Sequence, residues 1–412
     1  IGPVISSQAG LFDKNSDFYL STDDFISNIT RSAFDNEAIL IKGSRHFRFE
    51  RISDFLELKS HRTVMEVNLN AMIHNLNYFR SKLKPSVKVV AMVKAFSYGS
   101  GTYEIANVLQ YQKIDYLAVA FADEGIMLRT AGIRTPIIVM NPEEGTYPLL
   151  IDYGLEPEIY SFHVLRQFTN ALKSARVFGF PIHIKLDSGM HRLGFTEKEL
   201  DTLVTELRNS EHLKLSSIFS HLAASDESIH DDFTNNQIRV FENMSNRILR
   251  AFSYSIPRHI LNSSGIERFP QGQFDMVRLG IGLYGIGTEE NQKKLQNVSI
   301  LKSCILQIKT IPANETVGYA RNYKAEKETI IGIVPIGYAD GLSRTMGNGN
   351  ASFWVNGMLA PVIGNVCMDM CMIDLTGIPA SEGDAIEIFG NHISIATFAK
   401  KMGTIPYEVL TS

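Results

Sequence analysis

Between residues 87 and 279, short runs rich in β-branched residues alternate with longer segments of helical pattern. This alternation is typical of repeated βαβ units. Eight parallel strands with intervening helices favour a closed (β/α)8 barrel, because a doubly wound open sheet more often stops at five or six strands. The expected strands are Val87–Lys94, Tyr116–Phe121, Pro136–Met140, Glu156–Tyr160, Ile182–Asp187, Ser216–His221, His259–Ser263 and Met276–Leu279.

The pattern changes after Gly287 to strand-like segments separated by turn signals such as Asn356-Gly357. We therefore expect a barrel domain over residues 61–288 and a mostly β domain over residues 289–412. The segment Val64–Asn68 also alternates like a strand and is a candidate to pair into the β domain. The expected strand regions of that domain are Ile300–Ile311, Thr329–Pro335, Ala351–Val355, Ala360–Asp374 and Ala385–Phe389.

Charge and cysteine content narrow the function classes. Lys and Arg number 40 against 44 Asp and Glu, a net charge of -4, which gives no bulk electrostatic reason to bind nucleic acid or an anionic membrane. No apolar run approaches the roughly 20 residues that span a bilayer. The three cysteines are an odd number in a long chain, which indicates reduced thiols and a cytoplasmic location. No Cys or His pair follows the C-x3-C pair of Cys367 and Cys371, so no metal site is expected.

Residues 1–60 fit neither pattern. They contain an amphipathic stretch, Ser21–Ser32, an apolar strand, Ala38–Ile41, and a basic turn, Lys42–Arg45. The chain begins at Ile1 rather than Met, and we expect it to be an excerpt of a longer protein.

Polar side chains recur where the expected barrel strands end, which is where barrel enzymes place their chemistry. Lys94 ends the first strand and His221 the sixth. The fifth strand runs into Asp187–Arg192, the seventh into Asn262–Gly265 and the eighth into Arg278–Ile281.

These strand ends together predict a particular cofactor. An amine that emerges from the apolar run before Lys94 would have a lowered pKa and act as a nucleophile toward an aldehyde. The small residues of Asn262–Gly265 and Gly280–Gly282 offer amides and hydroxyls where such barrels hold a phosphate, with Arg278 beside them. His221 could lie against a flat ring. An aldehyde that carries a phosphate is pyridoxal 5'-phosphate.

Several motifs resemble those of the bacterial alanine racemases, in the same order and over about residues 62–412. That family has a pyridoxal-phosphate barrel followed by a β domain, works as a head-to-tail homodimer, and interconverts L- and D-alanine for peptidoglycan synthesis. The resemblance thus implies an isomerase of the same kind. The similar segments are Val89–Gly99, Lys185–Gly194, Asn262-Ser263, Arg278–Gly285, Val317–Tyr319, Pro335–Gly341 and Val366–Asp369.

The resemblance also implies residue roles. Lys94 would bond to the cofactor aldehyde, and Arg278 would face the pyridine nitrogen, which discourages side reactions. His221 would support the ring from beside it. The remaining cofactor contacts implied are Tyr98, Asn262, Ser263, Gly280, Ile281 and Tyr407.

Substrate contacts and a second base follow from the same resemblance. Arg192 would lie near the substrate carboxylate, and Lys185 matches a lysine that many members carry as a carbamate. Racemisation needs a base on each face of the substrate. Tyr319 from a partner's β domain matches the second base, with Tyr338 and Met368 also reaching the site from the partner.

Residues 1–60 resemble a different family. Ala38–Arg45 followed by Glu50 is similar to the last strand and turn of the Mur ligase that adds D-alanyl-D-alanine to the muramoyl tripeptide. This resemblance implies a ligase–racemase fusion of which the chain retains the ligase tail.

Three alternatives remain open at the level of sequence. A pyridoxal-phosphate decarboxylase of the same barrel class would place an acidic group opposite the pyridine nitrogen, and Arg278 argues against it. A non-catalytic pyridoxal-phosphate carrier would resemble the barrel alone, and the β domain argues against that. Serine remains an alternative substrate to alanine. A pocket distinguishes a methyl from a hydroxymethyl group by only about 1–3 kcal/mol of binding free energy.

Overall fold

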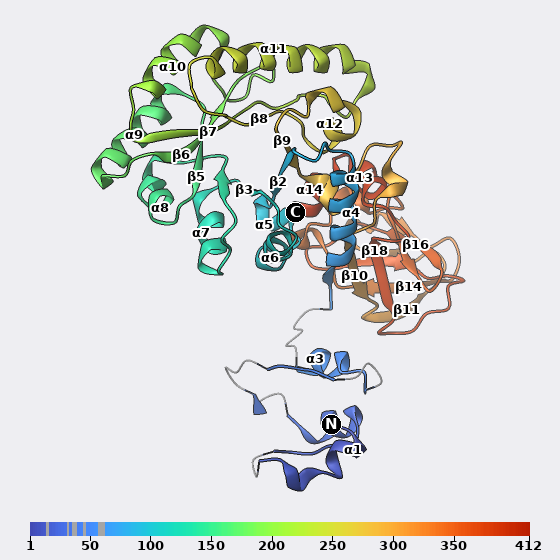
Figure 1. Cartoon of the computed structure of the whole chain (residues 1–412). Coiled ribbons are helices and arrows are strands. Elements are labelled where there is room, and N and C mark those ends of the chain that lie inside the picture. Colours follow the sequence, from blue (N-terminus) through green and yellow to red (C-terminus); the bar gives the residue numbers. More distant parts are fainter. Residues whose placement is uncertain (14–15, 31–32, 35–38, 44–46, 57–61) are drawn as a thin grey trace. The chain divides into compact units, whose positions relative to one another are not determined.

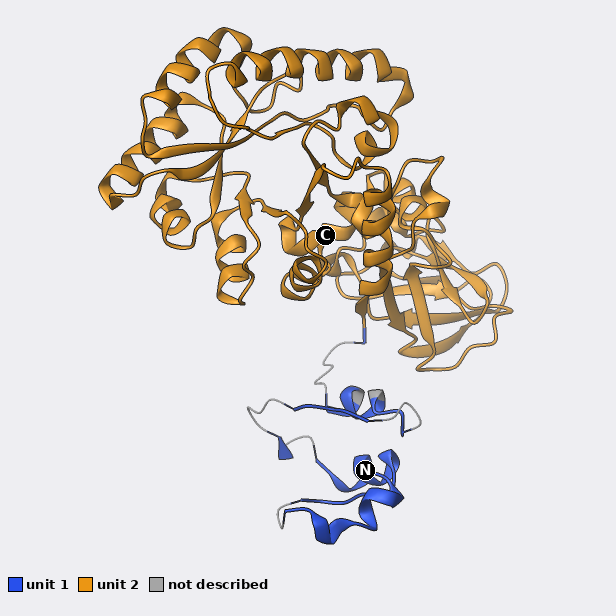
Figure 2. Cartoon of the chain, viewed as in Figure 1, with its two compact units in different colours: residues 1–62 blue, residues 63–412 orange. Residues whose placement is uncertain are grey.

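The structure is a computed structural model that describes residues 1–13, 16–30, 33–34, 39–43, 47–56 and 62–412. The chain forms two compact units, residues 1–62 and residues 63–412, shown in blue and orange in Figure 2. No helix in the described part of the chain combines the length and the apolar character needed to cross a bilayer.

The first unit is built from short helices: α1 (Pro3–Ser6), α2 (Thr22–Asn28) and α3 (Glu50–Leu56). Ser21 caps α2 by accepting a hydrogen bond from the Asp24 amide. The expected strand Ala38–Ile41 is wrong for its described part, because Ile39–Ile41 adopt no regular structure. Ala38, Ser32, Ser44 and Arg45, which belong to the segments predicted there, lie outside the described residues.

The second unit begins with a strand and then a closed barrel. Within residues 62–412, which are described without a gap, eight parallel strands form the barrel, and the last strand pairs with the first. This confirms the predicted barrel, and each strand lies within three residues of its expected start. The strands are β2 (Lys88–Met92), β3 (Tyr116–Val119), β4 (Ile137–Val139), β5 (Glu156–Ile159), β6 (Phe180–Lys185), β7 (Leu213–Phe219), β8 (Arg258–His259) and β9 (Met276–Leu279).

Helices cover the outside of the barrel, as α7 to α11 do in Figure 1, and α9, α10 and α11 are amphipathic. In α9 (Phe162–Ala175), Ser161 caps the first turn, and Val164, Leu165, Phe168 and Leu172 are buried at the spacing of one helix face. The other helices are α4 (Leu69–Ser81), α5 (Lys94–Tyr98), α6 (Tyr103–Tyr111), α7 (Ala122–Thr130), α8 (Tyr147–Asp152), α10 (Leu200–Arg208), α11 (Asp231–Leu249) and α12 (Ser263–Arg268).

The β domain is one antiparallel sheet in the order β1-β10-β18-β15-β16-β17-β14-β11. The strand β1 (Val64–Val67) precedes the barrel in sequence yet pairs with β10, Val64 opposite Lys302. Its other strands are β10 (Ser299–Cys304), β11 (Gln307–Ile311), β14 (Thr329–Val334), β15 (Ser352–Val355), β16 (Met358–Ile363), β17 (Cys371–Asp374) and β18 (Ala385–Phe389).

Two expected strands of this domain are each divided. The segment Ile300–Ile311 forms β10 and β11, which lie far apart in the sheet, and Ala360–Asp374 forms β16 and β17. The small ladder of β12 (Thr316–Val317) and β13 (Tyr323–Lys324) was not expected. Nor were the helices α13 (Ile395–Met402) and α14 (Pro406–Thr411), which end the chain.

Candidate active site

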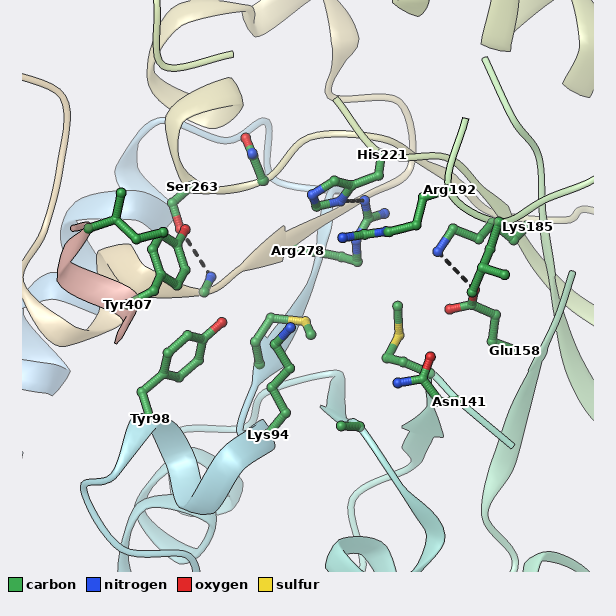
Figure 3. Close-up of a pocket in the computed structure, with 17 residues that line it drawn as sticks. Lys94, Tyr98, Asn141, Glu158, Lys185, Arg192, His221, Ser263, Arg278 and Tyr407 are labelled. Carbon is green, nitrogen blue, oxygen red and sulfur yellow. Dashed lines mark hydrogen bonds and ion pairs between the residues drawn. The ribbon is translucent and has the colours of Figure 1, made fainter. Parts of the chain in front are cut away.

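A cavity of about 560 Å³ opens where the barrel strands end (Figure 3). Four cationic side chains and the carboxylate of Glu158 line it, so the cavity suits an anionic molecule. Most of the predicted site residues meet there, namely Lys94, Tyr98, Lys185, Arg192, His221, Asn262, Ser263, Arg278, Gly280 and Tyr407. Ile281 is buried next to Gly280 and is not part of the lining.

Lys94 stands at the start of an unusual turn rather than at the end of a strand. β2 ends at Met92, and the four residues Ala95–Tyr98 all have φ between 50 and 54°, in the left-handed region that L-residues rarely adopt. The carboxylate of Glu124 holds the turn by accepting hydrogen bonds from the amides of Ala95 (2.5 Å) and Ala120 (2.6 Å). Backbone strain of this kind concentrates at functional sites.

The amine of Lys94 lies in an environment that favours its neutral form. Desolvation by the surrounding protein and then the positive charge of Arg192 lower the pKa of Lys94. The side chain nevertheless stays exposed to the cavity in the single chain. A neutral, accessible amine is the nucleophile that an aldehyde requires.

A second corner of the cavity is built from hydroxyls and amides. Ser263 Oγ accepts hydrogen bonds from the amides of Gly280 (3.0 Å) and Gly282 (3.1 Å). The hydroxyl of Tyr98 lies 3.0 Å from where a Cβ on Gly280 would be, so a side chain there would fill the space beside it. The rings of Tyr98 and Tyr407 are 5.8 Å apart, and burial raises the pKa of Tyr407 to about 12, which keeps its hydroxyl a donor.

Asn262 lies at this corner, but its side chain caps α12. Its Oδ1 accepts hydrogen bonds from the Gly265 amide (2.9 Å) and the Ser225 hydroxyl (2.8 Å). This side chain therefore fixes the helix that begins with Ser263.

Arg278 is buried on β9 and held by the neighbouring strands. It donates to His259 Nδ1 (2.8 Å), His221 Nδ1 (3.2 Å) and the Ser220 carbonyl (2.5 Å). Burial lowers its pKa to about 10, so the guanidinium remains charged at neutral pH. His221 and His259 have pKa values well below the usual one, because burial and then the charge of Arg278 disfavour the imidazolium.

A chain of hydrogen bonds continues from Arg278 through the barrel interior. His259 Nε2 lies 2.9 Å from Ser217 Oγ, which lies 2.6 Å from His183 Nδ1. His183 Nε2 is in turn 2.8 Å from Glu156 Oε2. Each imidazole is thereby satisfied on both nitrogens, which fixes its orientation.

Lys185 at the end of β6 is buried and paired. Its Nζ lies 2.8 Å from Glu158 Oε1 on β5, and the two side chains are 5% and 0% exposed. The sequence reasoning missed Glu158, although its position, two residues after Glu156 on the same strand, places both on one face. It also missed Asn141, which follows β4 and lines the cavity.

Tyr319, Tyr338 and Met368 lie on the β domain, outside the cavity lining. Their exposed fractions are 71%, 43% and 59%. Backbone hydrogen bonds join the loops of Tyr338 and Met368, and the Asn365 side chain donates to the Tyr319 carbonyl at 3.0 Å. The three residues thus belong to connected loops on the surface of the single chain.

The fold and the cavity define a class: a barrel enzyme with a β domain, whose basic cavity holds a nucleophilic amine at the strand ends. Comparison with known proteins identifies the family. The chain matches the models described as alanine racemase, N-terminal domain, over residues 67–288 and alanine racemase, C-terminal domain, over residues 298–412. The chain belongs to the alanine racemase family, whose members are pyridoxal-phosphate-dependent isomerases.

Individual relatives agree along most of their length. The alanine racemase of Thermodesulfovibrio yellowstonii is 35% identical over 359 residues, covering 84% of this chain and 94% of that protein. That of Helicobacter pylori J99 is 35% identical over 368 residues, covering 84% and 96%. The alanine racemase structure from Clostridium difficile 630 superposes with a TM-score of 0.80 at 31% identity, covering 85% of this chain and 93% of that one.

The cavity fits the cofactor of this family. The Bartonella henselae alanine racemase, a structural neighbour at 27% identity with a TM-score of 0.77 that covers 85% of this chain and 96% of that one, carries covalently bound pyridoxal phosphate. In this chain the hydroxyl of Tyr98 beside Gly280, the amine of Lys94 and the buried cation of Arg278 are suitable partners for a phosphate, an aldehyde and a ring nitrogen. The lining therefore fits a molecule with these three polar groups.

Proposed function

We propose that this chain interconverts L- and D-alanine by a two-base mechanism with pyridoxal phosphate, and so supplies D-alanine for peptidoglycan. The observation that carries the proposal is the position of Lys94, whose pKa is lowered and which shares one cavity with Arg192 and Arg278. When bound, the cofactor withdraws electrons from the substrate Cα and makes its proton acidic. We place the reaction in the cytoplasm.

The cavity residues divide the work of holding the cofactor and the substrate. Tyr98, Ser263, Tyr407 and the amides near Gly280 would hold the phosphate end, and the Asn262 cap keeps Ser263 in place. Arg278 would act on the ring nitrogen, and because a guanidinium keeps its proton, it would leave that nitrogen largely unprotonated. His221 would support the ring.

Lys94 and Arg192 act on the substrate. Arg192 binds the substrate carboxylate, which orients Cα toward the amine of Lys94. Lys94 removes or returns the Cα proton on one face, and its lowered pKa increases the fraction of the amine that is neutral and able to act as a base.

The second base comes from another protomer in this proposal. Tyr319 is 71% exposed and lies outside the cavity of its own chain, as do Tyr338 and Met368. A homodimer in which each β domain faces the partner's barrel would bring the partner's Tyr319 to the second face of the substrate. The partner's Tyr338 and the partner's Met368 would then complete the pocket around the small side chain.

The experiment that tests the function has two parts. Purified protein with pyridoxal phosphate should show a visible absorbance band that borohydride removes from wild type and that Lys94→Ala lacks. Incubation with L-alanine should produce D-alanine until the two are equal, and the same assay with serine measures the preference between the two substrates. Absence of D-alanine from cofactor-loaded protein would refute the proposal.

We propose that the chain divides into residues 1–60, 61–288 and 289–412. The first segment derives from the tail of a Mur ligase. The sequence similarity of the short motif near residues 38–45 supports the origin, although Ile39–Ile41 do not form the strand of that motif, and the compact unit of residues 1–62 supports the boundary. Removing residues 1–60 should leave racemase activity unchanged, and the 412-residue chain should not join D-alanyl-D-alanine to a muramoyl tripeptide with ATP. Loss of activity in a truncated but folded protein would contradict the division.

A further inference from the structure

The ion pair of Lys185 and Glu158 has no part in the steps above. The two side chains project from neighbouring strands, β6 and β5, into the cavity, and Figure 3 shows them facing each other. Burying two opposite charges is favourable only when each is well partnered, because both lose their hydration. The groups around this pair therefore indicate whether a cation or an anion is favoured at Lys185.

Both partners of Lys185 select a cation. The Glu158 carboxylate lies 2.8 Å from Nζ, and Nζ also lies over the ring of Phe219, 5.5 Å from its centroid. The face of an aromatic ring is negative and attracts an ammonium. Burial lowers the pKa of Lys185, and the charge of Glu158 opposes that shift.

A carbamate at Lys185 would be disfavoured by the same two partners. It forms when the neutral amine attacks carbon dioxide, with a new N–C bond and release of one proton, and it leaves an anion in place of the cation. That anion would lie beside the Glu158 carboxylate and against the negative face of Phe219. The other ionisable groups that act on the pair are Arg192, Arg278, Lys94 and Tyr160. Burial raises the pKa of Glu158, and the charges of Lys185, Arg278 and Arg192 oppose that shift. Within residues 62–412 the group that pairs directly with Nζ is Glu158.

We propose that Glu158 is a positioning residue that keeps Lys185 as an uncarbamylated ammonium. The Glu158 carboxylate then supplies the negative charge that a carbamate would otherwise supply on this side of the cavity. Among the described residues neither Glu158 oxygen makes a hydrogen bond, and Oε1 contacts Nζ as an ion pair, so both oxygens remain acceptors in a cavity that Arg192 also lines. The inference rests on the proposed function only where it concerns Arg192 and the substrate. The chemical state of Lys185 can be measured without turnover.

The test is carbon-13 NMR of the pyridoxal-phosphate-loaded protein in carbon-13 bicarbonate, where a lysine carbamate gives a carbonyl signal of its own. Wild type should show no such signal. Glu158→Gln removes the charge at nearly constant shape, so a neutral Lys185 should react and one signal should appear. The signal should be absent from Glu158→Gln combined with Lys185→Arg, because a guanidinium forms no carbamate.

Glu156→Gln is the matched control. Glu156 lies two residues earlier on β5 and contacts His183, two residues before Lys185 on β6, so its loss removes a carboxylate without exposing Lys185. It should give no signal. Glu158→Met also removes the charge and keeps a side chain of similar length, so it is the second variant if Glu158→Gln does not fold, and the same signal is expected.

A carbamate signal in wild type, or none in a folded Glu158→Gln or Glu158→Met protein, would overturn the inference. Racemisation gives an independent measurement: bicarbonate should leave the wild-type rate unchanged and should raise that of Glu158→Gln, about tenfold if the carbamate replaces the lost carboxylate. If the NMR pattern is found and no variant racemises, the proposed function fails and the state of Lys185 stands.

Discussion

Gly99 lies so close to Leu410 that a Cβ atom on Gly99 would collide with the Leu410 carbonyl oxygen. Gly99 ends the left-handed turn that begins at Lys94, and its own φ is 72°. Leu410 belongs to α14, the helix that carries Tyr407 into the cavity. The C-terminal helix therefore packs directly against the turn that begins at Lys94, and only a glycine permits this approach.

The first prediction concerns this contact. Gly99→Ala adds both a collision and a strained φ, so α14 should shift and Tyr407 should leave the cavity. We expect a loss of stability of about 1–3 kcal/mol and weaker binding of pyridoxal phosphate, measured by thermal unfolding and by cofactor titration. Gly101→Ala is the control, because Gly101 has a similar φ of 95° but only the end of the Glu104 side chain nearby. Equal effects of the two variants would mean that the contact with Leu410 does not matter.

The second prediction is a dependence of stability on pH. The pKa values of His221 and His259 are well below 6.5 in the folded chain, whereas in the unfolded chain each binds a proton near 6.5. The unfolded state thus binds more protons below pH 6.5, and the free energy of unfolding should fall as the pH falls, by up to about 1.4 kcal/mol per pH unit for each histidine. Well above pH 6.5 both histidines are neutral in the folded and the unfolded chain, so they do not change the free energy of unfolding with pH.

Denaturant unfolding at pH values from 8 to 5 checks this. His221→Gln should reduce the slope below pH 6.5 by about the contribution of one histidine. His163→Gln should not change it, because the His163 side chain is 70% exposed. A slope that is the same in His221→Gln and in wild type would assign the pH dependence to other groups.

The third prediction concerns the chain of hydrogen bonds behind Arg278. Ser217→Ala leaves His183 Nδ1 and His259 Nε2 without the partner they share, at a cost of about 1–3 kcal/mol in a buried site. Because His259 contacts Arg278, the absorbance band of the bound cofactor should also shift. Ser81→Ala, at an exposed serine that bonds only to a carbonyl of its own helix, is the control for both measurements.

Several strands of the barrel and of the β domain could be predicted from the sequence because they are short, mostly apolar runs bounded by turn residues. Met276–Leu279 and Ala385–Phe389 were located at their observed bounds for this reason. The division of Ile300–Ile311 could not be predicted, since β10 pairs with β18 and β11 with β14, and these pairings depend on residues far away in the chain. A local pattern shows that a segment is extended but not which strand it will join.

The sequence predicted many of the residues that line the cavity, but not the backbone geometry that positions them. Strand ends and the family resemblance identified the cavity lining from Lys94 to Tyr407. The left-handed turn after Lys94 left no local signal, because Glu124 and the C-terminal helix impose it from outside. Glu158 could not be predicted from the strand ends, because it lies one residue inside β5.

The last prediction is that each active site is shared between two chains. Racemisation must remove a proton from one face of a planar centre and deliver one to the other, and Lys94 lies on a single face. Tyr319, Tyr338 and Met368 are all exposed in the single chain and outside its cavity. A dimer with two-fold symmetry would use the same surface twice and build two equivalent sites.

Lys94→Ala and Tyr319→Phe should each be inactive alone, and mixing them after subunit exchange should restore activity. In a mixed dimer, one site has the lysine of one chain and the tyrosine of the other, while the second site lacks both. With random exchange, half of the dimers are mixed and each has one of its two sites intact, so about a quarter of the wild-type activity should return. Mixing Lys94→Ala with Arg278→Gln is the control, because both changes then lie in barrels, and every site lacks one of the two side chains. Mixed dimers that are demonstrably formed yet inactive, or a monomeric variant with the normal rate, would rule out a shared site.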